Sequence, residues 1–451
     1  MTRLQLNALS LAVCLAHAGL ACAAVTKEEA DKLKGPLTPM GAERAGNKDG
    51  TIPEWTGGLT KEAAGGGRLP ADAFASEKPL FTITAQNADQ HAAKLTEGSK
   101  VLLKTLPGYK ISVYPSHRTG AAPQWVYDNT YQNALKAKTT NDGLSVEGAT
   151  AGVPFPITKT GEEVMHNNNK NWRGVDFAMS ADSWVMPSSG KRTLTTSVEL
   201  TVSIPYYFEK GRRDPWGGKY YSVSIVDVTA PAYSAGERAL TLQPNDYVAE
   251  QPQSWSYLTG QRRLRKTPNV QYDVPFPYTS GLTNFDDANG FLGALDRYDW
   301  KLVGKQEIYT PYNTNGFYLA EGIDNIMGPQ FINPELLRWE LHRVWVVDAT
   351  LKAGARHQVP KKRFYVDEDT WWVMQTDHWD AKGLFWKNFQ ILPQVHPAVP
   401  VTTTFSNLIY NVQQKGYVFF NSMNRAPHTI KWKGLPAEEF TPQALERGGA
   451  R

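Results

Sequence analysis

Alternation of apolar and polar side chains is the feature that most constrains how this chain can fold. Between residues 192 and 204 threonine, serine and glutamate separate the apolar side chains Leu194, Val198, Leu200, Val202 and Ile204. Successive side chains of a β-strand point to opposite faces of a sheet, so this segment predicts a strand with one buried and one solvated face. Such strands are typical of antiparallel sheets and open barrels.

Strand-like segments of this kind recur until about residue 425. The predicted strands are 220–229, 300–309, 338–351, 361–366, 370–379, 384–392 and 417–421, while 401–410 fits a strand or a helix. Helices are predicted near the N-terminus, at 26–34, 85–106 and 123–138, with a short strand at 111–114. Because helices do not alternate with the later strands, a parallel βαβ sheet is excluded and a mainly β (α+β) fold is predicted.

The N-terminus predicts export. Arg3 precedes an apolar stretch at residues 4–20 that ends in small residues, which is typical of a secretory signal peptide at 1–23 with cleavage after Ala23. We therefore expect a periplasmic protein. An uncleaved anchor is the alternative, and Gly19 argues against lipidation of Cys22. Cleavage removes both cysteines, so the mature chain would have no disulfide, thiolate metal site or cysteine nucleophile.

Residues 24–75 are expected to form an extended N-terminal segment, because glycine and proline are dense from Gly35 to Leu69. Within this segment Asn47 to Ile52 is similar to the middle of a calcium-binding EF-hand loop. The loop lacks the first carboxylate and the bidentate glutamate that calcium needs, so a polar turn held by Asp49 is favoured and ion binding stays open.

Motifs for catalysis or for cofactor binding are missing from the sequence. It contains no Gly-x-Ser-x-Gly elbow, no phosphate-binding glycine loop and no paired histidines at metal-ligand spacing. The acidic runs Glu162-Glu163, Asp286-Asp287 and Asp367-Glu368-Asp369 are interpreted as solvated turns. Accordingly, we expect no catalytic residue, metal or cofactor.

Charge and aromatic content bear on the partners of the chain. The formal net charge is only +4, and no lysine- and arginine-rich block of the kind that binds nucleic acid is present. The basic run from Arg262 to Lys266 fits either a solvated strand face or a site for a phosphate or an anionic lipid headgroup. Fourteen tryptophans and twenty tyrosines fit either an apolar pocket or ordinary core packing.

Several long motifs resemble a known family. Residues 35–58, 259–265, 296–302 and 340–347 are similar to the signatures of domain-of-unknown-function family 1329, which is itself similar to periplasmic lipoprotein-sorting proteins. The resemblance implies a large curved antiparallel sheet, or half-barrel, at 76–430, lined with apolar residues and covered by helices, followed by a C-terminal tail at 431–451. It also implies a hydrophobic cargo, with an outer-membrane β-barrel and a resistance-nodulation-division transporter as partners.

The expected function is a non-catalytic periplasmic carrier that binds a lipid or another hydrophobic molecule in the half-barrel. A periplasmic hydrolase of lipid esters or glycans and a structural partner of an outer-membrane barrel are the alternatives. We expect Arg263, Arg265 and Arg343 to hold a headgroup. The residues expected to line the cavity are Leu200, Val202, Ile204, Leu341, Trp345, Val347, Trp372 and Phe389.

Overall fold

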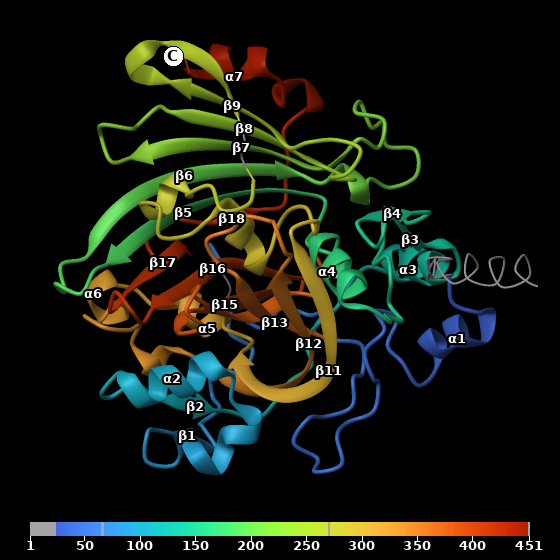
Figure 1. Cartoon of the computed structure of the whole chain (residues 1–451), viewed down its shortest axis with the longest axis vertical. Coiled ribbons are helices and arrows are strands. Elements are labelled where there is room, and N and C mark those ends of the chain that lie inside the picture. The colour runs from blue at the N-terminus through green and yellow to red at the C-terminus, as the bar shows by residue number, and fades with distance from the viewer. Residues whose placement is uncertain (1–23, 65–66, 269–270, 450–451) are drawn as a thin grey trace, which may run out of the picture.

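The computed structural model describes residues 24–64, 67–268 and 271–449, so the predicted signal peptide lies outside the described residues. A single 16-stranded sheet organises most of the described chain. Its strands follow the order β1-β2-β12-β13-β14-β15-β16-β17-β5-β6-β7-β8-β9-β10, with β11 beside β12 and β18 beside β5. The order does not close on itself, which confirms the predicted open, mainly β fold (Figure 1).

The strands fall into two groups along the chain. The first comprises β1 (Phe81–Ile83), β2 (Ile111–Val113), β5 (Asp176–Met186), β6 (Thr193–Ser203), β7 (Tyr220–Ala230), β8 (Arg238–Pro244), β9 (Gln253–Leu258) and β10 (Arg263–Thr267). The second comprises β11 (Tyr298–Pro311), β12 (Trp339–Leu351), β13 (Lys361–Asp367), β14 (Val373–Trp379), β15 (Phe385–His396), β16 (Val401–Asn411), β17 (Gly416–Ser422) and β18 (Ile430–Lys431). A separate hairpin joins β3 (Lys138–Thr140) and β4 (Ser145–Glu147).

Pairing within the sheet is antiparallel except at one place. There β2 meets β12 in parallel through the single residue pair Val113 and Trp339. The segment predicted at 401–410 is a strand, β16, that pairs with β15 and β17. Strand β5 was not predicted, because its sequence DFAMSADSWVM mixes small and polar residues and lacks a clean apolar alternation.

The described residues form seven α-helices around the sheet. They are α1 (Lys27–Asp31), α2 (Glu97–Thr105), α3 (Gln124–Lys136), α4 (Gly161–Asn169), α5 (Asn315–Leu319), α6 (Ile323–Ile326) and α7 (Pro442–Gly449). The helix predicted at 85–106 is divided, because the Thr96 side chain accepts a hydrogen bond from the backbone of Ser99 and begins α2. Helix α4 was not predicted; Glu163, expected in a solvated turn, forms a capping box with Thr160 at its start. No helix of the described residues is long and apolar enough to cross a membrane.

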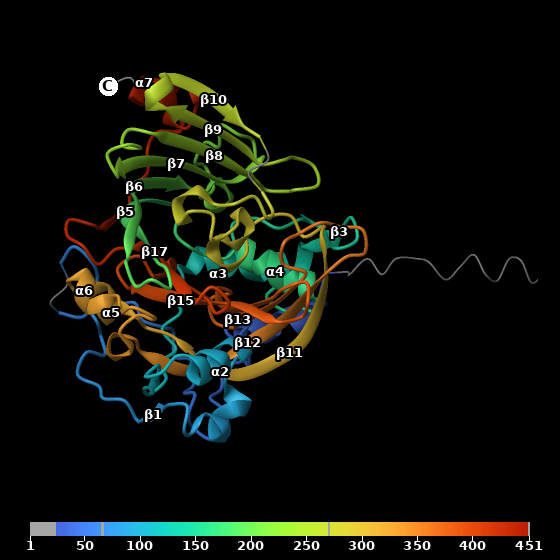
Figure 2. The same ribbon diagram turned by 60° about the vertical axis from the view of Figure 1, so that its left-hand side comes forward.

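The hydrophobic core has two main parts. The larger cluster lies in the half-barrel formed by β11 to β17 and extends onto the adjoining strands β5 and β6. Helix α4 and residues around Phe291 pack against the half-barrel. A smaller cluster lies between α7 and strands β7 to β9, at the other end of the molecule (Figures 1 and 2). The last helix therefore covers one face of the strands that end the sheet.

Candidate functional site

The residues predicted to line a cavity are largely packed against one another. Val202, Ile204, Leu341, Val347 and Phe389 are buried in the larger hydrophobic cluster, and half-buried Leu200 packs against it. The two largest pockets described below are lined by none of them. Phe389 borders a narrow pocket of about 20 Å³, which has room for one or two water molecules.

One of the two predicted tryptophans, Trp372, lies apart from this group, whereas Trp345 packs against it. Trp372 packs with Tyr312 and Met374 in a separate small cluster. Trp345 is half-buried and stacks against Trp371, with ring centroids 6.3 Å apart. The structure therefore divides the predicted lining among different surroundings.

The three predicted headgroup arginines are also separated. Arg263 and Arg265 are exposed on β10, the last strand of the sheet. Arg343 is buried, and its Nε donates to Glu368 Oε1 at 2.6 Å. The other end of its guanidinium donates to the backbone oxygens of Glu43 and Ala45, which fastens the N-terminal segment to β12.

The acidic turn at Asp367 to Asp369 is buried rather than solvated, contrary to expectation. Arg118 donates to both carboxylate oxygens of Asp369, at 2.9 and 2.6 Å. His342, Asp367 and Asp369 place ligand atoms within 4.8 Å of one another, a spacing that a metal ion could bridge. Because Arg118 engages both oxygens of Asp369, this cluster is better described as a buried ionic network.

Asp286 and Asp287 were likewise expected in a solvated turn, and the structure buries both. Lys362 Nζ lies 2.8 Å from Asp286 Oδ2 and 3.3 Å from Asp287 Oδ1, and His357 Nε2 lies 3.0 Å from the same Asp286 oxygen. The sequence could not show these partners, because they are more than 70 residues away along the chain. In the N-terminal segment, the turn at 47–52 is closed by Asn47 Oδ1, which accepts from Ile52 N, rather than by Asp49.

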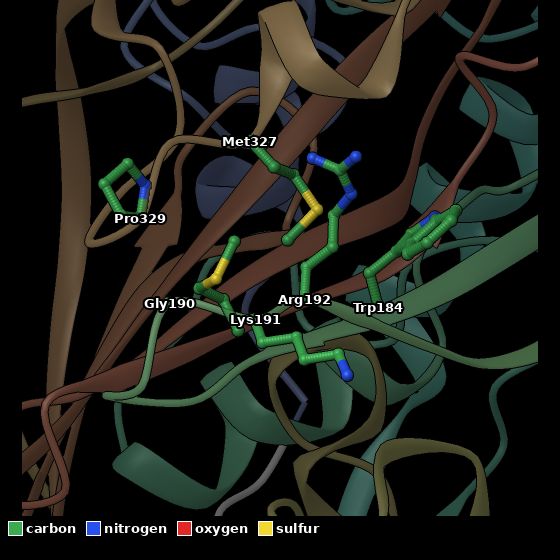
Figure 3. A pocket seen from close by; sticks show the side chains of 7 residues that line it. Trp184, Gly190, Lys191, Arg192, Met327 and Pro329 are labelled. Carbon is green, nitrogen blue, oxygen red and sulfur yellow. The ribbon is translucent and has the colours of Figure 1, made fainter.

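Two open pockets lie on either side of Trp184, at the end of the β5–β6 hairpin. One pocket has a volume of about 430 Å³ and is lined by Trp184, Met186, Gly190, Lys191, Arg192, Met327 and Pro329 (Figure 3). A second, of about 370 Å³, is lined by Asp182, Trp184, Glu321, Gly322, Ile323, Ile326, Ser422, Asn424, Arg425 and Ala426. We call these two pockets together the Trp184 groove.

Irregular strand pairing positions Trp184. The register of β5 against β6 shifts between Ser183 and Trp184, and the register of β17 against β5 shifts between Asp182 and Trp184. A bulge of this kind re-aims the side chain and increases the local twist. Trp184 consequently lies between the two pockets, where it contributes to both.

The groove has an apolar floor and a charged rim. Met186, Ile326 and Met327 are buried beneath it, whereas Lys191 and Pro329 are exposed at its edge. Methionine side chains are flexible and polarisable, so they adapt to apolar ligands of different shape. Figure 3 shows Arg192 and Met327 side by side between Trp184 and Pro329.

Two carboxylates in or beside the groove pair with arginines. Asp182 accepts hydrogen bonds from Arg425 Nε and Nη2, both at 2.7 Å, and Arg192 forms an ion pair with Asp324. Burial acts to raise the pKa of Asp182, but hydrogen bonds from Arg425 and His428 outweigh it and hold that pKa well below its usual range. The guanidinium of Arg192 also lies 6.0 Å from the ring centre of Trp184.

The residues of the Trp184 groove were not predicted. The one available signal was the pair Trp184 and Met186, two bulky apolar side chains at strand spacing in a segment otherwise rich in small residues. Their partners Ile326, Met327 and Arg425 come from segments more than 130 residues away along the chain.

Known proteins were compared with the chain in sequence and in structure. Residues 82–446 match the family described as protein of unknown function DUF1329. Uncharacterized protein PA3922 of Pseudomonas aeruginosa is 36% identical over 436 residues, which cover 95% of each chain. A solved DUF1329 protein of Desulfovibrio piger, 15% identical, overlays 63% of this chain and 97% of its own with a TM-score of 0.41. A Vibrio parahaemolyticus domain named for outer membrane lipoprotein sorting overlays the same shares with a TM-score of 0.41 and 12% identity.

Proposed function

The chain belongs to the DUF1329 family, and we propose that this protein is a non-catalytic binding protein whose ligand lies in the Trp184 groove. The ligand is an amphipathic molecule with an apolar body, such as a fatty acid or another lipid. On the basis of the sequence at residues 1–23, the protein works in the periplasm as a carrier. An outer-membrane barrel and a resistance-nodulation-division transporter are the proposed exchange partners.

The observation that carries this proposal is the combination of size and lining in the groove. Each of its two pockets falls within the range of about 300–1,000 Å³ that is usual for small-molecule sites. An apolar chain would contact Trp184, Met186, Met327 and Ile326, and burial of each methylene stabilises binding by about 0.8 kcal/mol. A polar headgroup would remain at the rim near Lys191, which forms no ion pair with a described residue.

The proposal is tested by titration with cis-parinaric acid, a fatty acid whose fluorescence rises in an apolar site. We expect saturable binding by the wild-type protein. Trp184→Ala should weaken it by at least about tenfold, since an aromatic side chain at the centre of a site typically contributes about 2 kcal/mol or more. Ile323→Trp, which fills the second pocket with a larger side chain, should weaken binding without removing Trp184.

Trp345→Ala is the matched control, because Trp345 is also half-buried and belongs to the half-barrel. It should bind the probe as the wild type does, and circular dichroism of each variant verifies that it is folded. Loss of binding in Trp345→Ala but not in Trp184→Ala would place the ligand in the half-barrel and contradict the proposal. Hydrolysis of p-nitrophenyl palmitate by the wild-type protein would contradict its non-catalytic character.

A further inference from the structure

A basic edge ends the sheet at β10. Among the strands of the described residues, β10 pairs with β9 alone, and Figure 2 shows it beside α7 at one end of the molecule. The exposed cations Arg262, Arg263, Arg265 and Lys266 follow one another along this edge. No acidic residue occurs between positions 251 and 272, and none of the four cations forms an ion pair with a described residue.

The four cations do not all lie on the same face of β10. Arg263 and Arg265 alternate with Leu264, which packs against the cluster beneath α7, so the two arginines lie on the face opposite α7. Lys266 lies on the α7 face, with its Nζ 5.5 Å from the ring centre of Trp255. Arg262 occupies the turn before the strand, with a left-handed backbone. A broad anionic surface could therefore contact several of them together.

An exposed aromatic side chain lies close to this basic edge. Tyr233 is 85% exposed, the highest value among the large apolar and aromatic side chains of the described residues. It belongs to the turn between β7 and β8, and this turn contacts the β9–β10 turn, where Thr259 Oγ1 donates to Ala235 O at 3.4 Å. Tyrosine beside arginine and lysine is the composition that favours the headgroup region of a membrane.

Edge cations have a second physical effect, since they prevent an exposed strand from pairing with another chain. The cations alone suffice to prevent such pairing, and the exposed Tyr233 on the adjacent hairpin is not needed for it. We propose that the β10 edge, defined as residues 262–266 together with Tyr233, docks the protein onto an anionic lipid surface. Each cation near such a surface contributes about 1 kcal/mol of attraction, so four of them hold the protein reversibly.

The docking is tested by co-sedimentation of the full-length mature protein with vesicles. Vesicles of phosphatidylcholine and phosphatidylglycerol should bind the protein, whereas vesicles of phosphatidylcholine alone should not. Arg263→Thr together with Arg265→Thr keeps a strand-forming side chain at both positions, and it should lower the vesicle partition coefficient by about 25-fold, or about fivefold for each cation. High salt should abolish binding of the wild type, because the charges are exposed.

The matched control is Arg356→Thr together with Lys382→Thr. It removes two exposed cations from turns of the half-barrel and should leave vesicle binding unchanged. Tyr233→Ser should lower the partition coefficient by a few fold while keeping the salt dependence. Equal weakening by the control pair would show that net charge alone acts, and this outcome would overturn the proposal. Binding to polyglutamate without binding to the anionic vesicles would assign the edge to an acidic protein and would also overturn it.

Discussion

Three buried histidines have pKa values that burial lowers. His396 is 3% exposed, and its Nε2 lies 3.0 Å from Gln394 Oε1. Burial lowers the pKa of His396 to about 3 and the pKa of His166 to about 4. Burial also holds the pKa of His378 well below its ordinary value. The rings of His396 and His166 are therefore largely neutral in the folded protein at pH 5 and above.

The pKa values of these histidines are lower in the folded chain than in the unfolded chain, and this makes folding stability depend on pH. The unfolded chain takes up a proton on each of these three histidines near pH 6.5, whereas the folded chain does not, so stability is lost as the pH falls below about 6.5. His396→Gln removes one of these groups and keeps a polar side chain. We expect its loss of unfolding free energy between pH 7 and pH 5 to be about 2 kcal/mol smaller than that of the wild type. Urea unfolding at both pH values measures this, and equal losses would contradict the assignment.

The environment of a neighbouring pair was predictable from strand geometry. Asp377 and His378 are neighbours on β14, so their side chains point to opposite faces of the strand. Asp377 accepts from Gly98 N at the start of α2 and from Asn388 Nδ2, whereas His378 packs near Phe389 with ring centroids 4.8 Å apart. The same reasoning could not show that both faces of β14 are buried, because burial depends on what covers the sheet.

At the scale of elements, the segment at residues 282–291 packs inside the half-barrel. Asn168 of α4 donates to Phe291 O at 3.0 Å and accepts from Val373 N of β14 at 3.1 Å, so it joins this segment to the sheet. Gly290 in the same segment adopts a positive φ of 82° and lies so close that a Cβ there would meet Val373 Cβ at 2.5 Å. Lys362 and Lys387 hold it through Asp286 and through Leu282 O.

The ion pair at Lys362 should therefore matter for stability. Lys362→Met keeps the length of the side chain but leaves Asp286 and Asp287 buried without their cation, and we expect it to lower the unfolding free energy by about 3–5 kcal/mol. Denaturant unfolding measures the change. Lys361→Met is the control, because Lys361 is the exposed neighbour on the same strand, and its effect should stay within about 0.5 kcal/mol. A small effect at Lys362 would mean that the aspartates find other partners.

At the scale of the whole molecule, the two largest hydrophobic clusters of the described residues differ greatly in size. The smaller one lies beneath α7, where Leu445 is 0% exposed and Phe440 is 2% exposed against β7 to β9. The larger core fills the half-barrel and contains most of the buried aromatic side chains. A region with its own small core opens at a lower free energy than the rest of a protein.

Hydrogen exchange tests this division. Leu445→Ala removes a fully buried leucine, which typically costs about 2–5 kcal/mol. We expect the amides of β7 to β10 to exchange faster in this variant, while those of β12 to β16 keep their wild-type protection. Leu435→Ala serves as the control, since Leu435 is 39% exposed in the same C-terminal region, and it should leave both groups unchanged. Faster exchange throughout the chain would show a single cooperative unit instead.

The sequence by itself determined the fold class and most of the second group of strands, because alternation along one strand is a local property. The motifs at residues 259–265 and 340–347 also placed the chain in its family, since such motifs are contiguous. Only the tertiary structure decided that the half-barrel is filled, that the acidic runs are buried, and that the open groove surrounds Trp184. Each of these depends on pairs of residues far apart along the chain, such as Asp286 with Lys362 and Trp184 with Met327. No local pattern records which distant side chain covers a given face.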